Sequence, residues 1–155
     1  MKKYFLLFAL LFSLLLCSSL FTSCKSSKTE SFFELKYAKS ACKGRCPVFD
    51  LTIRDDQMVV FNGRKYTTIV GIVQIKLSDK KYQKLQDLIT GSQFLETDAI
   101  GYNRPFDIPV TTLEVTKGEK NKKQIVYLEK PKNLEPLLAF LDMLVIEIQA
   151  DSRTN

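Results

Sequence analysis

The stretch FDLTIRDDQMVVFNG, residues 49–63, holds two short apolar runs separated by polar residues. Its first five residues alternate apolar and polar side chains, the period of two that is typical of a half-buried β-strand. Residues 54–57 predict a turn, and residues 58–61 predict a second strand. The stretch therefore predicts two neighbouring strands of one sheet.

The sheet is expected to continue after this pair. Asn62 and Gly63 predict a tight hairpin turn, because both residue types adopt positive φ at low cost. A third strand is expected within residues 68–77, which are rich in β-branched side chains. Short links between successive strands imply antiparallel pairing.

A helix is predicted directly after the third strand. Ser78 can cap its N-terminus, and Asp79 is favourably placed in its first turn. The helix is expected to end at Gly91. Its apolar side chains lie at helical spacing on one face: Tyr82, Leu85, Leu88 and Ile89. Residues 96–109 predict a loop, because they contain Gly101, Asn103, Pro105 and Pro109.

A second hairpin and a second helix follow the loop. The hairpin is predicted from residues 111–117 and 123–129, turning through residues 118–121. In the helix, Asn133 can cap the N-terminus and Pro136 falls in the first turn, where its missing N–H costs little. An apolar stripe runs along one side: Leu134, Leu137, Leu138, Leu141, Leu144, Val145 and Ile148. Such a stripe predicts a helix face packed on a sheet.

The order of elements is strands, helix, strands, helix. Two helices can cover one face of an antiparallel sheet, so we expect an α+β fold, a two-layer sandwich. Residues 32–150 are long enough for a single domain with a modest core. Residues 151–155 are expected to form a polar tail.

The N-terminus resembles a bacterial export signal. Lys2 and Lys3 precede an apolar run over residues 4–16, which has the length of a signal-peptide core. Small polar residues then lead to Cys24, as in the lipobox of bacterial lipoproteins. Residues 1–23 are therefore expected to be a signal peptide, and Cys24 the lipidated residue. Residues 24–31 comprise that cysteine and a polar tether without apolar anchors.

The expected location is the outer membrane, facing the periplasm. Lys25 follows the lipidated cysteine, whereas an aspartate there marks inner-membrane retention in many Gram-negative bacteria. Without residues 1–23 the chain has 21 basic and 17 acidic side chains, a net charge of +4. This surplus is spread along the chain and is not gathered in one block, as nucleic-acid binding would require. The expected partners are the membrane, reached through the lipid, and an envelope protein or glycan. No nucleic-acid partner is expected.

Several kinds of chemistry are disfavoured by composition. The chain has no histidine, which removes the commonest general base near neutral pH and most catalytic metal sites. Asp55 and Asp56 lie in a predicted turn, where local hydrogen bonding explains them. Glu96, Asp98 and Asp107 lie in or next to the long loop, and a carbohydrate-active enzyme using them is the weaker hypothesis. We expect no enzyme activity, no cofactor and no metal.

Cys42 and Cys46 admit three interpretations. An exported protein favours a disulfide between two cysteines this close in sequence, and Gly44 lets the short loop turn. A thiol-redox site is the second, because Lys43 and Arg45 would lower a thiolate pKa. A Cu(I) clamp is the third, because two thiolates can hold this soft ion. The disulfide is the leading prediction.

Two motifs in the chain resemble those of a known family. Residues 42–49, CKGRCPVF, are similar to the C-x-G-x-C-P-x-[YF] opening of an uncharacterised domain of Bacteroidetes lipoproteins and exported proteins. Asp107, Pro109 and Thr111 match a D-x-P-x-T element of the same family. The resemblance covers about residues 33–148 and implies an exported domain without an assigned activity. It also suggests that the cysteine loop and the loop with Asp107 lie together, as a possible interaction site.

The resulting functional expectation is a non-enzymatic lipoprotein domain of the outer membrane with a binding or structural role. The alternative is a periplasmic thiol-redox or Cu(I)-handling accessory protein that uses Cys42 and Cys46.

Overall fold

The structure is a computed structural model that describes residues 32–98, 108–127 and 129–151. The predicted signal peptide, Cys24, the tether, Asp107 and most of the polar tail lie outside these residues. Ser31–Asn155 form one compact unit. No helix among the described residues is long and apolar enough to cross a bilayer.

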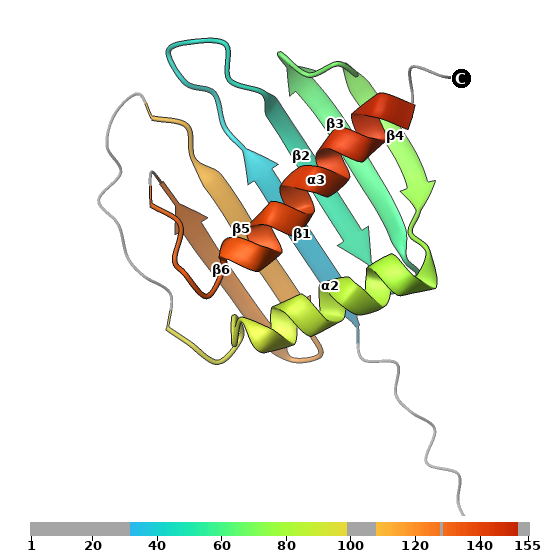
Figure 1. Cartoon of the computed structure of the whole chain (residues 1–155), viewed down its shortest axis with the longest axis vertical. Coiled ribbons are helices and arrows are strands. Elements are labelled where there is room, and N and C mark those ends of the chain that lie inside the picture. The colour runs from blue at the N-terminus through green and yellow to red at the C-terminus, as the bar shows by residue number, and fades with distance from the viewer. Residues whose placement is uncertain (1–31, 99–107, 128, 152–155) are drawn as a thin grey trace, which may run out of the picture. The chain divides into compact units, whose positions relative to one another are not determined.

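Six antiparallel strands and two helices make up this unit (Figure 1). The strands are β1 (Phe33–Lys39), β2 (Val48–Arg54), β3 (Met58–Lys65), β4 (Gly71–Lys76), β5 (Thr111–Lys117) and β6 (Lys120–Val126). The helices are α2 (Asp79–Gly91) and α3 (Glu135–Asp151). The strand order across the sheet is β4-β3-β2-β1-β5-β6. The predicted α+β class and the order strands, helix, strands, helix are confirmed.

Both helices cover the same face of the sheet (Figure 1). α3 crosses the middle of the sheet diagonally, and α2 runs along one end of the strands. The apolar side chains that point toward the helices alternate along β1, β2 and β3 and are buried: Phe33, Leu35, Tyr37, Phe49, Leu51, Ile53, Val59 and Phe61. These residues form a single core with Leu85 and Ile89 of α2 and with the apolar stripe of α3. The opposite face of the sheet carries polar and half-buried side chains, and no described helix covers it.

β1 is the element that the sequence prediction missed. It lies between β2 and β5, with Leu35 aligned with Ile53 on one side and Val115 on the other. Its pattern of buried and exposed residues alternates as in β2. The prediction started the sheet at residue 49, one strand too late.

The predicted turn at Asn62 and Gly63 is wrong, because β3 continues through both residues to Lys65. Gly63 is instead a point of close approach. A Cβ at this position would lie 1.9 Å from the carbonyl oxygen of Ile69. The chain therefore turns over residues 66–70, and only glycine leaves room for that turn.

Two further element boundaries differ from the prediction. β6 begins at Lys120, three residues before the predicted start at residue 123. The link from β5 is only Gly118 and Glu119, and Gly118 has a φ of +60°. α3 begins at Glu135, so Asn133 is not its N-cap residue. The Asn133 amide nitrogen instead donates to the carbonyl oxygen of Ser92, at the end of α2.

The predicted start of α2 is confirmed. The Ser78 hydroxyl accepts a hydrogen bond from the backbone N–H of Lys81 at 3.4 Å. Tyr82 of this helix also meets Phe33 of β1 edge to face, with ring centroids 5.9 Å apart. This contact fixes α2 against the first strand.

Candidate functional site

The cysteine loop connects β1 to β2. Cys42 and Cys46 form a disulfide, with their Cα atoms 5.7 Å apart. The three residues between them are exposed, and the backbone N–H of Gly44 donates to the Cys42 sulfur at 3.2 Å. The bridge therefore closes a small surface loop immediately before β2.

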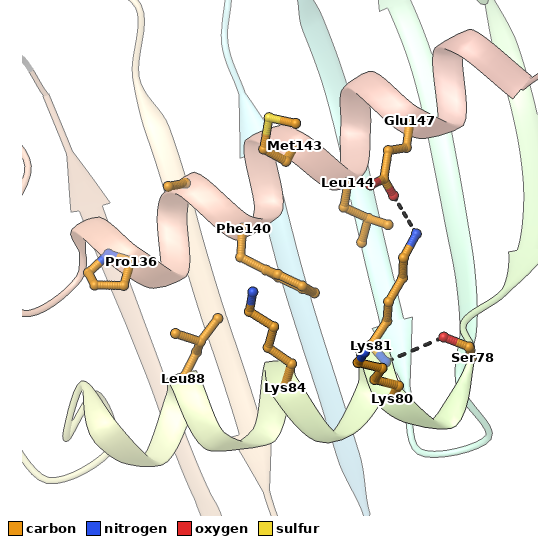
Figure 2. A pocket seen from close by; sticks show the side chains of 11 residues that line it. Ser78, Lys80, Lys81, Lys84, Leu88, Pro136, Phe140, Met143, Leu144 and Glu147 are labelled. Carbon is orange, nitrogen blue, oxygen red and sulfur yellow. Dashed lines mark hydrogen bonds and ion pairs between the residues drawn. The ribbon is translucent and has the colours of Figure 1, made fainter.

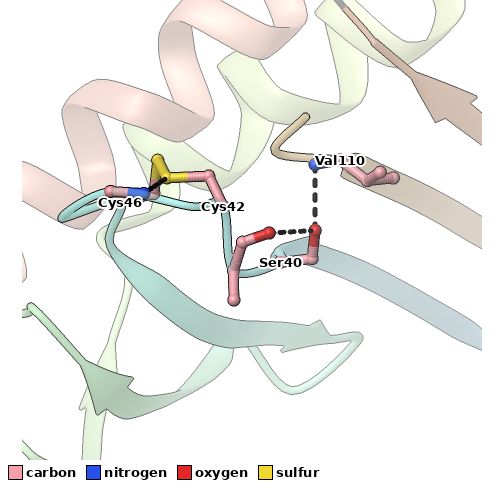
Figure 3. The surroundings of a disulfide bond; sticks show 6 residues. Ser40, Cys42, Cys46 and Val110 are labelled. Atoms are coloured by element: carbon pink, nitrogen blue, oxygen red, sulfur yellow. Dashed lines mark hydrogen bonds between the residues drawn. A yellow bond between two sulfur atoms is a disulfide. The ribbon is translucent and has the colours of Figure 1, made fainter. Parts of the chain in front are cut away.

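The base of this loop lies against the segment that leads into β5 (Figure 3). The backbone N–H of Ser40 donates to the carbonyl oxygen of Val110 at 2.9 Å. The backbone N–H of Val110 donates in turn to the Ser40 hydroxyl at 2.9 Å. Thr111 pairs with Lys39 in the β1–β5 ladder. Two of the predicted interaction residues, Pro109 and Thr111, are thus near the base of the cysteine loop, whereas Asp107 lies outside the described residues.

A charged network holds the same end of β1 to α3. The buried Tyr37 hydroxyl donates to Oδ1 of Asp142 at 2.6 Å, and the Lys39 amino group donates to the same oxygen at 2.6 Å. Lys130 approaches the other carboxylate oxygen at 3.4 Å. One carboxylate of α3 therefore gathers three donors at the end of β1 that leads into the cysteine loop.

The protonation states in this network follow from its surroundings. Burial acts to raise the pKa of the Asp142 carboxyl, but the hydrogen bonds from Lys39 and Tyr37 and the nearby lysine charges outweigh it, so the pKa is lowered. Burial, and then the hydrogen bond to Asp142, raise the pKa of the Tyr37 hydroxyl. At neutral pH the network thus holds an ionised Asp142 and a protonated Tyr37. This arrangement suits a structural tie.

The other predicted carboxylates have local partners. The Asp55 side chain accepts from the backbone N–H of Asp56, and the Asp56 side chain accepts from that of Met58. These bonds are the turn contacts that the sequence predicted. Glu96 forms an exposed ion pair with Lys120 at 2.6 Å. No group of three or more histidine, cysteine or acidic residues within the described ranges could hold a metal ion.

A groove between α2 and α3 is a feature that the sequence prediction did not find (Figure 2). Its volume is about 630 Å³. The apolar side chains that line it are Leu88, Pro136, Ala139, Phe140, Met143 and Leu144. Met143 is 55% exposed, and Phe140 is half-buried against the core. The helix layer therefore has an open apolar recess on its outer side.

Three lysines of α2 border the groove. Lys81 forms an ion pair with Glu147 across it. The Lys84 amino group lies 5.9 Å from the centre of the Phe140 ring and points into the groove (Figure 2). Among the described residues, neither Lys80 nor Lys84 forms an ion pair with a carboxylate. The groove thus combines an apolar floor with a positive rim.

A signal for this groove is present in the sequence of α3. The helix has the predicted stripe toward the sheet, and a second set of apolar residues on its outer side. These residues follow helical spacing: Pro136, Ala139, Met143 and Ile146. A helix that is apolar on both sides is typical of one covered on both sides. The position of α2 beside it, which completes the groove, depends on the tertiary fold.

Comparison with known proteins gives one family. No curated protein matches the chain. The model of a family described as a domain of unknown function, DUF6438, matches residues 33–145, from the first residue of β1 into α3. That range includes the whole sheet, the cysteine loop and most of the groove. The chain therefore belongs to the DUF6438 family.

Proposed function

We propose that the protein is a lipid-anchored domain of the outer membrane that faces the periplasm and binds another envelope component without catalysing a reaction. The observation that carries the binding role is the groove between α2 and α3, where apolar side chains lie exposed between helices. Exposed apolar recesses with a few charged groups at the rim are typical of binding sites.

The sequence before the domain supports the anchor. Lys2, Lys3 and the apolar run over residues 4–16 have the order of an export signal, and Cys24 follows at the position of a lipidated residue. The resemblance of residues 42–49 to domains of Bacteroidetes lipoproteins supports the same placement. The Cys42–Cys46 disulfide fits an oxidising compartment outside the cytoplasm.

Labelling and fractionation of cells that express the full chain test this proposal. We expect wild-type protein to incorporate an alkyne-labelled fatty acid and to be recovered with the outer membrane. The Cys24→Ala variant should lose the label and keep its signal peptide. Protease added to cells should digest the domain only after the outer membrane is permeabilised. Unlabelled wild-type protein, or protein recovered in the soluble fraction, would refute the anchor.

Thiol alkylation separates the binding role from the redox and Cu(I) alternative. In the proposed role, native protein reacts with a mass-tagged alkylating reagent at Cys42 and Cys46 only after reduction. A Cys42→Ser, Cys46→Ser variant should retain the partners that crosslinking captures in native envelopes. A mixture of free and bridged thiols in cells, together with loss of partners in the variant, would favour the alternative.

A further inference from the structure

We propose that the groove between α2 and α3 binds an anionic amphiphile with a single acyl chain. The chain would lie on the apolar floor, and a carboxylate or phosphate headgroup would lie beside Lys80 and Lys84. This inference rests on the binding role proposed above and names the class of ligand.

The floor of the groove suits an acyl chain. Leu88 from α2 and Phe140 from α3 lie on either side of the recess (Figure 2), and Met143 of α3 also lines it. The volume of about 630 Å³ falls within the range of about 300–1,000 Å³ that small-molecule sites occupy. Methionine is an unbranched, flexible side chain that adapts to chains of different shape. The groove therefore offers space and apolar contact for a flexible hydrocarbon.

The rim of the groove selects the charge of the ligand. Lys80 and Lys84 are four residues apart on α2, so they lie on one side of the helix, one turn from each other. Glu147 neutralises Lys81 but has no ion pair with either of these two lysines among the described residues. Two positive charges on one side of an apolar recess complement a negative headgroup at one end of an apolar chain.

The distribution of exposed apolar groups on the helices favours binding of one acyl chain in the groove over contact of this face with a flat membrane surface. The outer side of α2 is polar, with Gln83 hydrogen-bonded to Asp87 at 2.8 Å. A helix that lies in a bilayer surface needs a continuous apolar face toward the lipid. Within the two helices, the large exposed apolar side chains belong to the groove, at Met143, and to the adjacent outer side of α3, where Ile146 is 57% exposed.

Titration calorimetry with palmitate at concentrations below micelle formation tests the proposal. The protein used is residues 31–155, since this unit has its own core. We expect one palmitate per chain, with hexadecanol and hexadecyltrimethylammonium, which have the same chain length, binding at least tenfold more weakly. The variant Lys80→Gln, Lys84→Gln should lose at least tenfold in palmitate affinity and keep its affinity for hexadecanol.

Matched variants separate charge from position. The variant Lys65→Gln, Lys123→Gln also removes two positive charges, but at positions outside the groove, and it should bind palmitate like the wild type. Met143→Asp changes an exposed groove residue and should weaken both palmitate and hexadecanol. Circular dichroism should show that each variant is folded.

Three results would overturn the assignment: no palmitate binding, equal palmitate affinity of Lys80→Gln, Lys84→Gln and the wild type, or association only with phosphatidylglycerol vesicles and not with monomeric palmitate. The last result would mean that this face contacts a membrane. Each of these results leaves the labelling test of Cys24 unaffected, so failure of the ligand assignment is distinguishable from failure of the anchor.

Discussion

At the scale of single residues, the Asp142 network shows how one polar contact fixes β1 to the helix layer. Tyr37 is 1% exposed, and its hydroxyl has a charged acceptor at 2.6 Å. Tyr37→Phe would keep the ring in the core and leave Asp142 with one donor fewer. We expect a loss of about 1–3 kcal/mol in the free energy of unfolding, measured by urea denaturation. Tyr66→Phe, at an exposed ring, is the control and should change little.

The lowered pKa of Asp142 makes the stability of the fold depend on pH. Because the folded state holds this pKa below 3.8, its ordinary value, the contribution is complete well above that value and is lost as the pH falls through the folded pKa. Asp142→Asn should be less stable than the wild type at pH 7, and the difference should shrink as the pH falls below 3.8. Thermal unfolding across this range measures it, with the exposed Glu119→Gln as the control. A difference that is constant with pH would contradict the prediction.

Gly63 is a residue whose role the sequence could not reveal. Asparagine followed by glycine predicts a turn from local preferences, but here β2 and β4 pair on both sides of β3 and keep Gly63 in the strand. Gly63→Ala would place a Cβ against the backbone of Ile69. We expect a destabilisation of at least about 1–3 kcal/mol by urea denaturation. At Gly91 an added Cβ would meet no atom within 4 Å apart from its chain neighbours and the backbone of its own helix, so Gly91→Ala should not destabilise the domain.

At the scale of elements, the features that depend only on neighbouring residues were predicted correctly from the sequence. The cap at Ser78, the stripe of α3 and the alternation in β2 each depend on neighbouring residues, and each was found from the sequence. β1 has the same alternation, with Phe33, Leu35 and Tyr37 buried. Its central place, however, comes from pairing with β5, which follows more than seventy residues later. Such long-range pairing has no local signal.

The same distinction applies to the candidate site. The cysteine pair and the element with Pro109 and Thr111 are visible as motifs, and the resemblance suggested that they lie together. The apolar outer side of α3 is present in the sequence, but the groove itself could not be predicted, because it needs this side of α3 and the lysines of α2 to meet. Only the packing of both helices on one sheet face brings these residues together.

The cysteine loop is an element whose contribution to stability can be measured directly. A bridge that closes so short a loop restricts the unfolded chain little, so Cys42→Ser, Cys46→Ser should lose about 2 kcal/mol and still fold. Urea denaturation measures the loss, and wild-type protein in reductant should lose a similar amount. A variant that does not fold would show that the loop organises the start of β2 and the end of β1 together.

At the scale of the whole domain, the two edges of the sheet differ in how they are protected. β6 has lysines at 120, 122 and 123, and charged residues at a sheet edge disfavour pairing with another chain. Exposed apolar residues lie in β4 and directly before it: Ile72 is 67% exposed and Val70 is 74% exposed. Among the described residues, each of these strands is paired on one side only. β4 is therefore the edge open to strand addition.

This asymmetry predicts concentration-dependent association through β4. Residues 31–155 should self-associate as their concentration rises in sedimentation velocity, because β4 is paired, within the described ranges, only with β3 and offers the backbone N–H and C=O groups of its other edge to a second copy. Ile72→Lys introduces a charge at that edge and should shift the equilibrium toward the monomer by at least tenfold in dissociation constant. Ile125→Lys, at the half-exposed outer side of β6, is the matched control and should leave association unchanged. If Ile125→Lys had the larger effect, the contact would be at β6, and the lysines of that edge would not protect it.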